Sequence, residues 1–449
     1  MTLLFKDRRE LENLLRKGDL RVAVYGMGGV GLAIATVWIR AGAKVLGVDI
    51  DDEKVRKLNR GIVTHAEEVV VNTLKNAIEN ELFRATTDGV WASKESDLKI
   101  VIVPLLLKNG IPDFNPLKDA ITKIGRGLKR GDVVVVETSV PPGTTEGLVR
   151  EILERESSLK AEDDFGLAYS PERVMIGRAV EDIEERYPKI VAGIGPRSAK
   201  VVEALYSLIA KKGVIVLSNP KVAELEKLVE GVYRDVNIAL ANEIWRLCNE
   251  LGVDYSEVLR AANSQPYCHL HKPGVGVGGI CIPIYPQLLL WKAKKLSIDL
   301  KLVMTARKLN EDQPRHVLHV IKKSIKSIRL NSKAKIVIMG LSYRGDIGDT
   351  RMSPTYKLID LMIKSGFKNI VVHDPYVKFD EKLTSKGIPL TSSLEEALHE
   401  ADVIVIATDH SEYKELSKEC LTSLVGKKDF ILIDTKQVVS SQSMEGSIY

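Results

Sequence analysis

Short apolar runs alternate with helical stretches along the first 210 residues of the chain. An apolar run of four to eight residues bounded by glycine or proline predicts a buried strand, and apolar positions recurring every three or four residues predict a helix. The pattern predicts a helix over 29–42 and strands over 20–25, 43–50, 98–106, 132–139 and 165–171. This alternation indicates a parallel sheet with helices on both faces.

The pattern changes near residue 213. Residues 222–252 contain no proline and carry too many apolar positions for one exposed face, so we expect one long, largely buried helix that also serves as a dimer seam. More helix follows through Leu309, and strands return over 334–340, 369–375, 401–409 and 429–435. The fold class predicted is α/β, with two doubly wound Rossmann-like domains joined by a long central helix and a helical middle domain. The predicted boundaries are 1–212, 213–312 and 313–449.

Composition excludes several classes of protein. A net charge of +5 over 449 residues, with 5% aromatic residues, argues against a nucleic-acid partner, although mild basicity suits an anionic small molecule. No apolar run is long enough to cross a membrane, and the first 19 residues have no apolar core like that of a signal peptide. The scattered cysteines form no CxxC pair, so we expect no metal site and a cytoplasmic protein. They are Cys248, Cys268, Cys281 and Cys420.

A glycine-rich turn stands between the first predicted strand and helix. It reads GMGGVG, and Gly26, Gly28 and Gly31 have the GxGxxG spacing of a dinucleotide-binding turn, in which the amino end of the helix faces the phosphates. Val30 lies in the first turn of that helix and is grouped with the glycines as cofactor-binding. Asp49 ends the second strand, where a carboxylate accepts ribose hydroxyls and repels a 2′-phosphate. The sequence therefore predicts NAD as the cofactor; the alternative is a turn that only packs.

A cysteine follows the most glycine-rich loop of the chain. Residues 274–286 read GVGVGGICIPIYP, so Cys281 stands on a flexible backbone where a substrate could reach it. The alternative is a small apolar residue that happens to follow glycines. Lys227 lies on the long helix, one turn before Gly231. Its ammonium group either extends to solvent or is held in a pocket beside a thiolate or a developing oxyanion.

Motifs along almost the whole chain resemble the UDP-glucose/GDP-mannose dehydrogenase family, most of all its UDP-N-acetylmannosamine dehydrogenase branch. They agree in order and spacing. They are GMGGVG, ETSVPPGTT (137–145), YSPERV (169–174), AELEKLVEGVYRDVNIALANE (223–243), PGVGVGGICIP (273–283), GLSYRGDIGDTRMSP (340–354), HDP (373–375) and IDTK (433–436). The resemblance implies an NAD-dependent enzyme of polysaccharide biosynthesis that binds a nucleotide sugar. It also implies that the third domain binds the nucleotide sugar. The long central helix suggests a homodimer or larger homo-oligomer.

The resemblance implies two oxidations of the sugar C6 alcohol in one pocket. Cys281 matches the nucleophile, which forms a thiohemiacetal with the aldehyde and then a thioester that water hydrolyses to the uronate. Lys227 matches the lysine that stabilises the alkoxide and oxyanion, and Glu172 matches a glutamate that assists proton transfer or positions water. Glu172 could instead cap a helix.

The resemblance also implies binding residues. Ser139 aligns with a threonine that holds a catalytic water, and Arg351 matches an arginine near sugar and cofactor; both are grouped as cofactor-binding. Arg351 could instead pair with Asp346 or Asp349. The predicted substrate-binding residues are Arg234, Gly276, Gly278, Gly279 and Lys436.

Several positions depart from the family pattern. The usual GGHCIPVDP is GGICIPIYP here, with Ile280 for histidine and Tyr285 for an aspartate that helps to activate water. Gly231 replaces an asparagine and Tyr267 an arginine. Tyrosine is neutral at pH 7, so Tyr285 cannot supply the missing charge. Two further departures are Leu105-Leu106 for Thr-Pro and Ile176 for proline.

The departures leave three hypotheses open. The first is a four-electron nucleotide-sugar 6-dehydrogenase, retuned or compensated by Asp235, His269 or His271. Within it, a weakened or single-oxidation enzyme is the alternative. The second is a two-electron hydroxyacid dehydrogenase, which would turn over without Cys281. The third is a non-catalytic protein that binds NAD and a nucleotide sugar.

Overall fold

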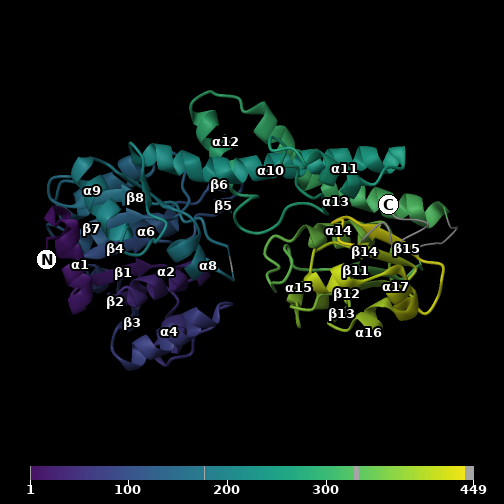
Figure 1. Ribbon diagram of the computed structural model, residues 1–449, viewed down its shortest axis with the longest axis horizontal. Coiled ribbons are helices and arrows are strands. Elements are labelled where there is room, and N and C mark those ends of the chain that lie inside the picture. The colour runs from purple at the N-terminus through teal and green to yellow at the C-terminus, as the bar shows by residue number, and fades with distance from the viewer. Residues whose placement is uncertain (1, 176, 328–332, 440–449) are drawn as a thin grey trace. The chain divides into compact units, whose positions relative to one another are not determined.

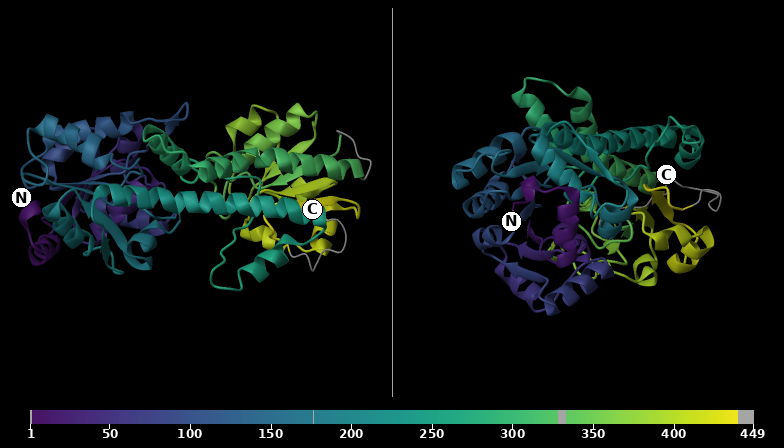
Figure 2. Two further views of the ribbon diagram at one scale, coloured as in Figure 1. Left: turned by 90° about the horizontal axis from the view of Figure 1, so that it is seen from above. Right: turned by 60° about the vertical axis from the view of Figure 1, so that its left-hand side comes forward.

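The computed structural model describes residues 2–175, 177–327 and 333–439. The chain forms two compact units, the first made of Met1–Glu230 with Trp291–Ser297 and the second of Gly231–Leu290 with Ile298–Tyr449. Helix α10 (Pro220–Leu251) begins in the first unit and ends in the second, and Figure 2 shows it unbroken. The three-domain division predicted from sequence stays a prediction. Ile176 lies outside the described residues.

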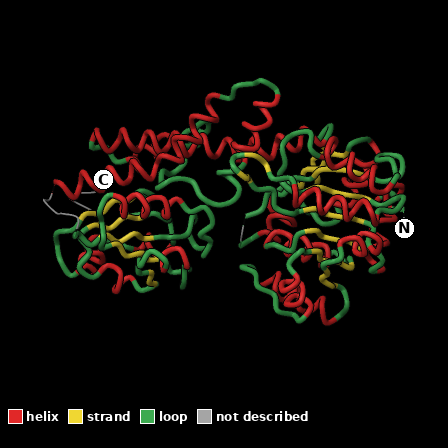
Figure 3. Tube along the Cα trace, turned by 180° about the vertical axis from the view of Figure 1, so that it is seen from behind, coloured by secondary structure: helices red, strands yellow, loops and turns green. Residues whose placement is uncertain are grey.

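The first unit is built on an eight-stranded sheet with the order β10-β9-β8-β7-β4-β1-β2-β3. Neighbouring strands are parallel except β8 and β9. Figure 3 shows its strands side by side with helices on both faces. The strands are β1 (Arg21–Tyr25), β2 (Lys44–Val48), β3 (Phe83–Thr86), β4 (Leu98–Val101), β7 (Val133–Val136), β8 (Gly166–Tyr169), β9 (Lys189–Gly193) and β10 (Val214–Val216).

Alternate side chains of these strands face opposite helix layers. Val22 and Val24 pack into a core with helices α1, α2, α4 and α9, whereas the Tyr25 hydroxyl points the other way and donates to the Gly89 carbonyl of α5. Helix α6, labelled in Figure 1, packs against α5 and against α7. The helices are α1 (Arg8–Lys17), α2 (Gly29–Arg40), α3 (Asp52–Asn59), α4 (Glu68–Glu79), α5 (Gly89–Glu95), α6 (Asn115–Gly127), α7 (Arg150–Ser157), α8 (Ala179–Glu181) and α9 (Pro196–Tyr206).

One predicted strand is too long. The apolar run over 98–106 predicts one strand, but β4 ends at Val101. Pro104 lies within the remainder and has no N–H to donate to a ladder. A two-residue hairpin follows, formed by β5 (Leu107–Lys108) and β6 (Ile111–Pro112).

The second unit contains a five-stranded parallel sheet with the order β13-β12-β11-β14-β15. Ile336 and Ile338 face helices α13 and α14, and Val337 and Met339 face α16 and α17. The strands are β11 (Ile336–Met339), β12 (Ile370–His373), β13 (Leu390–Thr391), β14 (Val403–Ile406) and β15 (Ile431–Asp434). Two sheets of mainly parallel strands with helices around them, and a helical stretch between them in the chain, confirm the predicted fold class.

The helical middle is longer than predicted. Helix α13 continues past Leu309 to Ser327, although it contains Pro314. The remaining helices are α11 (Tyr255–Ala262), α12 (Tyr285–Lys295), α13 (Lys301–Ser327), α14 (Pro354–Lys364), α15 (Glu381–Thr384), α16 (Leu394–Leu398) and α17 (Lys418–Val425). Among the described residues, no helix combines the length and the apolar character needed to span a bilayer.

Candidate functional site

The three glycines of the first turn have three different surroundings. Gly26 has φ +107°, and a Cβ there would lie 2.8 Å from the Ile102 carbonyl oxygen. A Cβ at Gly31 would lie 1.8 Å from the Gly26 carbonyl oxygen, so Gly31 lets α2 pack against the turn. Gly28 caps α2, and among the described residues no atom beyond its chain neighbours lies within 4 Å of the position of a Cβ there. The turn therefore leaves open space at the amino end of α2, where phosphate binds in dinucleotide folds. Val30 lies half-buried in the first turn of that helix.

Asp49 lies beside this turn and is held as an anion. Its carboxylate accepts N–H groups of Met27 (3.0 Å) and Asp51 (3.0 Å) and an ion pair from Lys54 (2.8 Å). Burial raises its pKa, but these hydrogen bonds outweigh burial and the net shift is downward. An ionised carboxylate beside the open space at Gly28 fits the ribose of NAD and would repel the 2′-phosphate of NADP.

Glu172 belongs to a buried cluster at the same edge of the sheet. Lys189 Nζ lies 2.5 Å from Glu172 Oε2 and 3.3 Å from Glu137 Oε2, and the Tyr206 hydroxyl donates to Glu137. Burial raises the pKa of Glu137 to about 7, whereas for Glu172 the Lys189 ammonium outweighs burial and lowers the pKa. Glu172 lies in a loop, where one carboxylate oxygen accepts the N–H of Arg173, and caps no helix. Its catalytic role stays a prediction.

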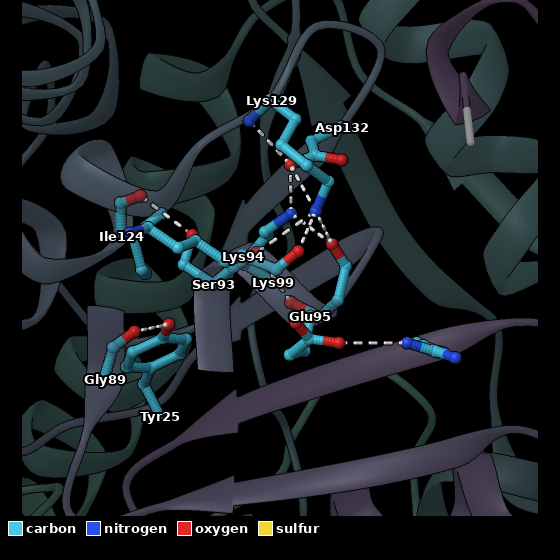
Figure 4. A network of polar contacts seen from close by, with 11 residues as sticks. Tyr25, Gly89, Ser93, Lys94, Glu95, Lys99, Ile124, Lys129 and Asp132 are labelled. Carbon is cyan, nitrogen blue, oxygen red and sulfur yellow. Dashed lines mark hydrogen bonds and ion pairs between the residues drawn. The ribbon is translucent and has the colours of Figure 1, made fainter. Parts of the chain in front are cut away.

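A second buried lysine of this unit lies at the opposite edge of the sheet (Figure 4). Lys99 is fully buried, and its ammonium donates to Asp132 and to the Ser96 carbonyl. Ser96 and Asp132 precede β4 and β7, so the network lies at the amino ends of parallel strands. Burial lowers the pKa of Lys99 to about 8. Because ligands bind outside the carboxyl ends of such strands, we interpret the Lys99 network as structural and the Lys189 cluster as part of the site.

Helix α10 enters the first unit through acidic anchors. The buried Glu224 carboxylate accepts N–H groups of Gly143 (2.5 Å) and Thr145 (2.8 Å), in the loop that follows Ser139. Six residues later on the helix, Glu230 pairs with Arg173 at 3.2 Å. Lys227 lies between these anchors and is 8% exposed, so its backbone is fixed in the first unit. Ser139 is half-buried, and its role, like that of Lys227, stays a prediction.

Cys281 belongs to the second unit and follows a glycine loop that packs on protein. Cβ atoms at Gly278 and Gly279 would lie 2.6 and 2.9 Å from Tyr343, and one at Gly276 would lie 3.0 Å from Pro354. The space beside these glycines is therefore filled by the segment 343–354, unlike the space at Gly28. Cys281 itself is exposed. Substrate binding by the three glycines stays a prediction, as does the meeting of Cys281 with Lys227.

Arg351 has the structural partner that the sequence allowed. Its guanidinium pairs with both Asp349 oxygens, at 2.9 Å from Nε to Oδ1 and 2.6 Å from Nη2 to Oδ2. Asp346 accepts instead from the N–H and hydroxyl of Ser411. The hydrogen bond from Arg351 to Asp349 raises the pKa of the guanidinium, which remains half exposed. A ligand could therefore contact Arg351 without breaking its pair, and its cofactor role stays a prediction.

The remaining predicted residues of the second unit have mixed surroundings. Lys436 lies against Gly274, with Nζ 3.1 Å from the position of a Cβ there, and Arg234 is exposed on α10. Asp235 is buried and pairs with Arg307 at 2.7 Å, so its carboxylate is already used within the core. Tyr267, which stands where the family pattern has an arginine, is exposed.

Three segments of the sequence match the three domains of one family. Residues 20–210 match the NAD binding domain of the UDP-glucose/GDP-mannose dehydrogenase family, residues 221–312 its central domain and residues 337–441 its UDP binding domain. The chain belongs to the UDP-glucose/GDP-mannose dehydrogenase family. This confirms the resemblance recognised in the motifs.

Relatives of the UDP-glucose/GDP-mannose dehydrogenase family align with nearly the whole chain. A UDP-N-acetyl-D-mannosamine dehydrogenase from Pyrococcus horikoshii is 36% identical, over 94% of this chain and 96% of the relative. An NDP-N-acetyl-D-galactosaminuronic acid dehydrogenase from Ralstonia solanacearum is 31% identical, over 94% and 97%. A solved structure of the UDP-D-ManNAc dehydrogenase from Pyrococcus horikoshii superposes with a TM-score of 0.86 at 33% identity, covering 96% of this chain and 98% of that one.

The family match defines the class of enzyme. As a UDP-glucose/GDP-mannose dehydrogenase family member, the protein is an NAD-dependent nucleotide-sugar dehydrogenase. NAD as cofactor is thus confirmed, and the hydroxyacid dehydrogenase and non-catalytic hypotheses are set aside. Sequence reasoning missed the residues that hold the candidate site in place, Lys189, Glu137 and Glu224. A lysine or glutamate at the end of an apolar strand gives no sign of its partner, which comes from a distant segment.

Proposed function

We propose that the protein oxidises UDP-N-acetyl-D-mannosamine at C6 to the uronate. The observation that carries the proposal is the 36% identity, over 94% of the chain, to a relative named for that substrate. Two features of the structure support it: the open, acid-flanked turn at Gly28 and an exposed cysteine after the glycine loop.

The proposed chemistry assigns one task to each of three side chains. The Cys281 thiolate adds to the C6 aldehyde and holds the carbon first as a thiohemiacetal and then as a thioester, which water cleaves to release the thiol and the uronate. Lys227 stabilises the alkoxide and oxyanion. Glu172, kept anionic by Lys189, positions the water or takes its proton. NAD, held at the Gly28 turn beside Asp49, would supply the hydride acceptor for both oxidations, so we expect two NADH for each sugar.

A catalytically weakened or single-oxidation enzyme is the second candidate, and one observation favours it. Tyr285 and Gly231 stand where the family pattern has an aspartate and an asparagine, both of which would serve thioester hydrolysis. If these losses slow that hydrolysis, Cys281 stays acylated after both oxidations and turnover is weakened; if the aldehyde leaves before the second oxidation, the product is an aldehyde and one NADH.

The test is a substrate panel with product stoichiometry. UDP-ManNAc, UDP-GlcNAc, UDP-GalNAc, UDP-glucose and GDP-mannose are each incubated with NAD, and NADH yield and product mass are measured. The proposal expects two NADH and a uronate from UDP-ManNAc, and no uronate from the Cys281→Ser variant. One NADH and an aldehyde from the wild type would establish the second candidate. A preference for another sugar of the panel would identify that sugar as the substrate in place of UDP-ManNAc.

We also propose that the protein assembles as a homodimer through α10. Exposed apolar side chains follow one face of this helix at spacings of three, four or seven residues; they are Val222, Leu225, Val229, Tyr233, Leu240, Leu247 and Leu251. A stripe of this kind favours a matching stripe on a second copy. Light scattering should give the mass of a dimer for the wild type and of a monomer for Leu240→Glu. A monomeric wild type would contradict the proposal.

A further inference from the structure

Gly231 is the one glycine of the 32-residue helix α10. A glycine inside a helix destabilises it by roughly 0.5–1 kcal/mol relative to alanine. The backbone at Gly231 does not have a positive φ, so helix geometry gives no reason for glycine here. The reason has to come from what packs against the helix at this position.

The ring of Tyr285 lies against the bare backbone of Gly231. A Cβ added at Gly231 would lie 2.4 Å from Tyr285 Cδ2 and 3.2 Å from its Cβ and Cγ. Since real Cβ atoms do not approach other atoms this closely, alanine at 231 would force the ring or the helix to move. The two residues belong to the same compact unit. Glycine at 231 and an aromatic ring at 285 are therefore sterically matched.

Tyr285 connects this contact to the cysteine. It is the first residue of α12, and its N–H donates to the Cys281 carbonyl at 3.0 Å, as does the N–H of Ile284. On the other side of the cysteine, the N–H of Gly279 donates to the Arg351 carbonyl at 2.9 Å. The turn that carries Cys281 is thus held at both ends, by Arg351 before it and by the seated Tyr285 ring after it. The thiol between them stays exposed.

We propose that Tyr285 is a positioning residue that fixes the Cys281 turn by seating its ring on Gly231. The significance of this positioning for catalysis rests on the proposed function, in which Cys281 carries the substrate carbon. The two departures from the family pattern, at 231 and 285, are then one coupled change. A side chain at 231 excludes the ring, and a small residue at 285 leaves the turn without its support.

The test measures the reactivity of Cys281 directly. Wild type, Gly231→Ala, Tyr285→Ala, the double variant and Tyr285→Phe are treated with iodoacetamide, and alkylation of the Cys281 peptide is followed by mass spectrometry. Cys420, also exposed in the second unit, serves as the reference thiol within each molecule. Gly231→Ala should change the alkylation rate of Cys281 at least threefold and leave that of Cys420 unchanged. Alanine is the better helix former, so a weaker α10 cannot explain the change.

The double variant makes the contact itself testable. Once the ring is removed, Gly231→Ala should have no further effect, so the two substitutions should be strongly non-additive. Tyr285→Phe retains the ring and should keep the wild-type alkylation rate. Equal effects of Gly231→Ala with and without the ring, or no effect at all, would overturn the proposal. So would a Tyr285→Phe variant that behaves like Tyr285→Ala.

Turnover separates this proposal from the proposed function. If the wild type forms uronate, Gly231→Ala should lower kcat by roughly tenfold or more with a smaller change in KM, because small displacements of a reacting group are costly. If the wild type forms no uronate, the proposed function fails, while the alkylation result still decides whether Tyr285 positions the turn. If the wild type is active and Gly231→Ala has an unchanged kcat, only the claim that the positioning matters for catalysis is rejected.

Discussion

Each of the two α/β units contains the same local arrangement, in which a glycine turn after one strand contacts an aspartate after the neighbouring strand. We call this arrangement the strand corner, and the two units use it differently. In the first, Gly26 (φ +107°) donates its N–H to the Val48 carbonyl at 2.7 Å, and the next N–H, of Met27, donates to Asp49 at 3.0 Å. In the second, Gly340 (φ +108°) donates to the His373 carbonyl at 2.7 Å, and Leu341 donates to Asp374 at 2.9 Å. In each unit, an aspartate that follows one strand thus lies against the glycine turn that follows the neighbouring strand.

The aspartates differ in what else they bind. Asp49 has Asp51 and Lys54 as further partners. Asp374 is fully buried and also accepts from the N–H and hydroxyl of Ser342, from the N–H of Tyr376 and from His410 Nε2. Its carboxylate is therefore occupied by the protein itself.

The segments after the glycines differ as well. Helix α2 begins at Gly29, three residues after Gly26, whereas α14 begins at Pro354, fourteen residues after Gly340. Only the first corner combines a helix amino end, open space and an acid that is not fully buried. A strand corner alone therefore does not make a dinucleotide site. We predict that Asp374 stabilises the second unit and that Asp49 binds the ribose of NAD.

Replacing Asp374 should have the largest effect. Asp374→Asn leaves buried donors without the charged acceptor that now satisfies them, so we expect a loss of roughly 3–5 kcal/mol in the stability of the second unit. Peptide-level hydrogen exchange of β11 and β12 measures it, with β1 and β2 as the control region. An affinity for NAD that fell in step with this loss would contradict the division of roles.

Acid should weaken the second corner in a defined window. Burial raises the pKa of Asp374, but the hydrogen bonds from His410 and Ser342 outweigh it and set the pKa at about 2. A carboxyl whose folded pKa lies below its unfolded value of about 4 stabilises the fold above that value, and the contribution is lost as pH falls from about 4 to 2. The loss should be about 2–3 kcal/mol.

The same exchange measurement checks this between pH 5 and 2.5, after correction for intrinsic rates. Protection in β11 and β12 should fall in the wild type and stay flat in Asp374→Asn, which has no carboxyl to protonate. A parallel fall in both proteins would assign the acid sensitivity to other groups.

Local chemistry explains what could be predicted from the sequence. The glycine turn and Asp49 could be found because the turn chemistry lies within six residues and the acid ends the next predicted strand. Strand β3 was not predicted because FRAT is short and half polar, and β13 because it has two residues. Strands β9 and β10 were not predicted either. The strand over 98–106 was overextended because an apolar run does not show where a ladder ends.

Contacts between distant segments explain what could not be predicted. Gly231 and Tyr285 each stand out as a departure, but only the structure shows that one fills the space the other leaves. The sequence did not predict strand β9, and only the fold brings Glu137 and Glu172 to Lys189 at its start.

Replacing Asp49 should change cofactor choice and leave the stability of the second unit unchanged. A hydrogen bond to a charged group contributes roughly 1.5–3 kcal/mol, so Asp49→Asn should raise KM for NAD roughly 10- to 100-fold. The repulsion of a 2′-phosphate disappears with the charge, so the preference for NAD over NADP should narrow. Initial rates with both cofactors measure this, and the exchange of β11 and β12 peptides should not change. A variant that still rejected NADP as strongly as the wild type would remove Asp49 from cofactor choice.

Lys54 should have the smallest effect, because its ion pair with Asp49 is 39% exposed on the lysine side. Such pairs contribute about 0.2–1 kcal/mol, so Lys54→Met should change KM for NAD by no more than about fivefold. The direction should be downward, since Asp49 loses a competitor for the ribose hydroxyls, and NADP should be rejected more strongly. Lys57→Met is the matched control, because Lys57 pairs with Glu53 on the same helix at 2.7 Å and does not contact Asp49. A rise in KM for NAD with Lys54→Met alone would mean that Lys54 itself helps to hold the cofactor.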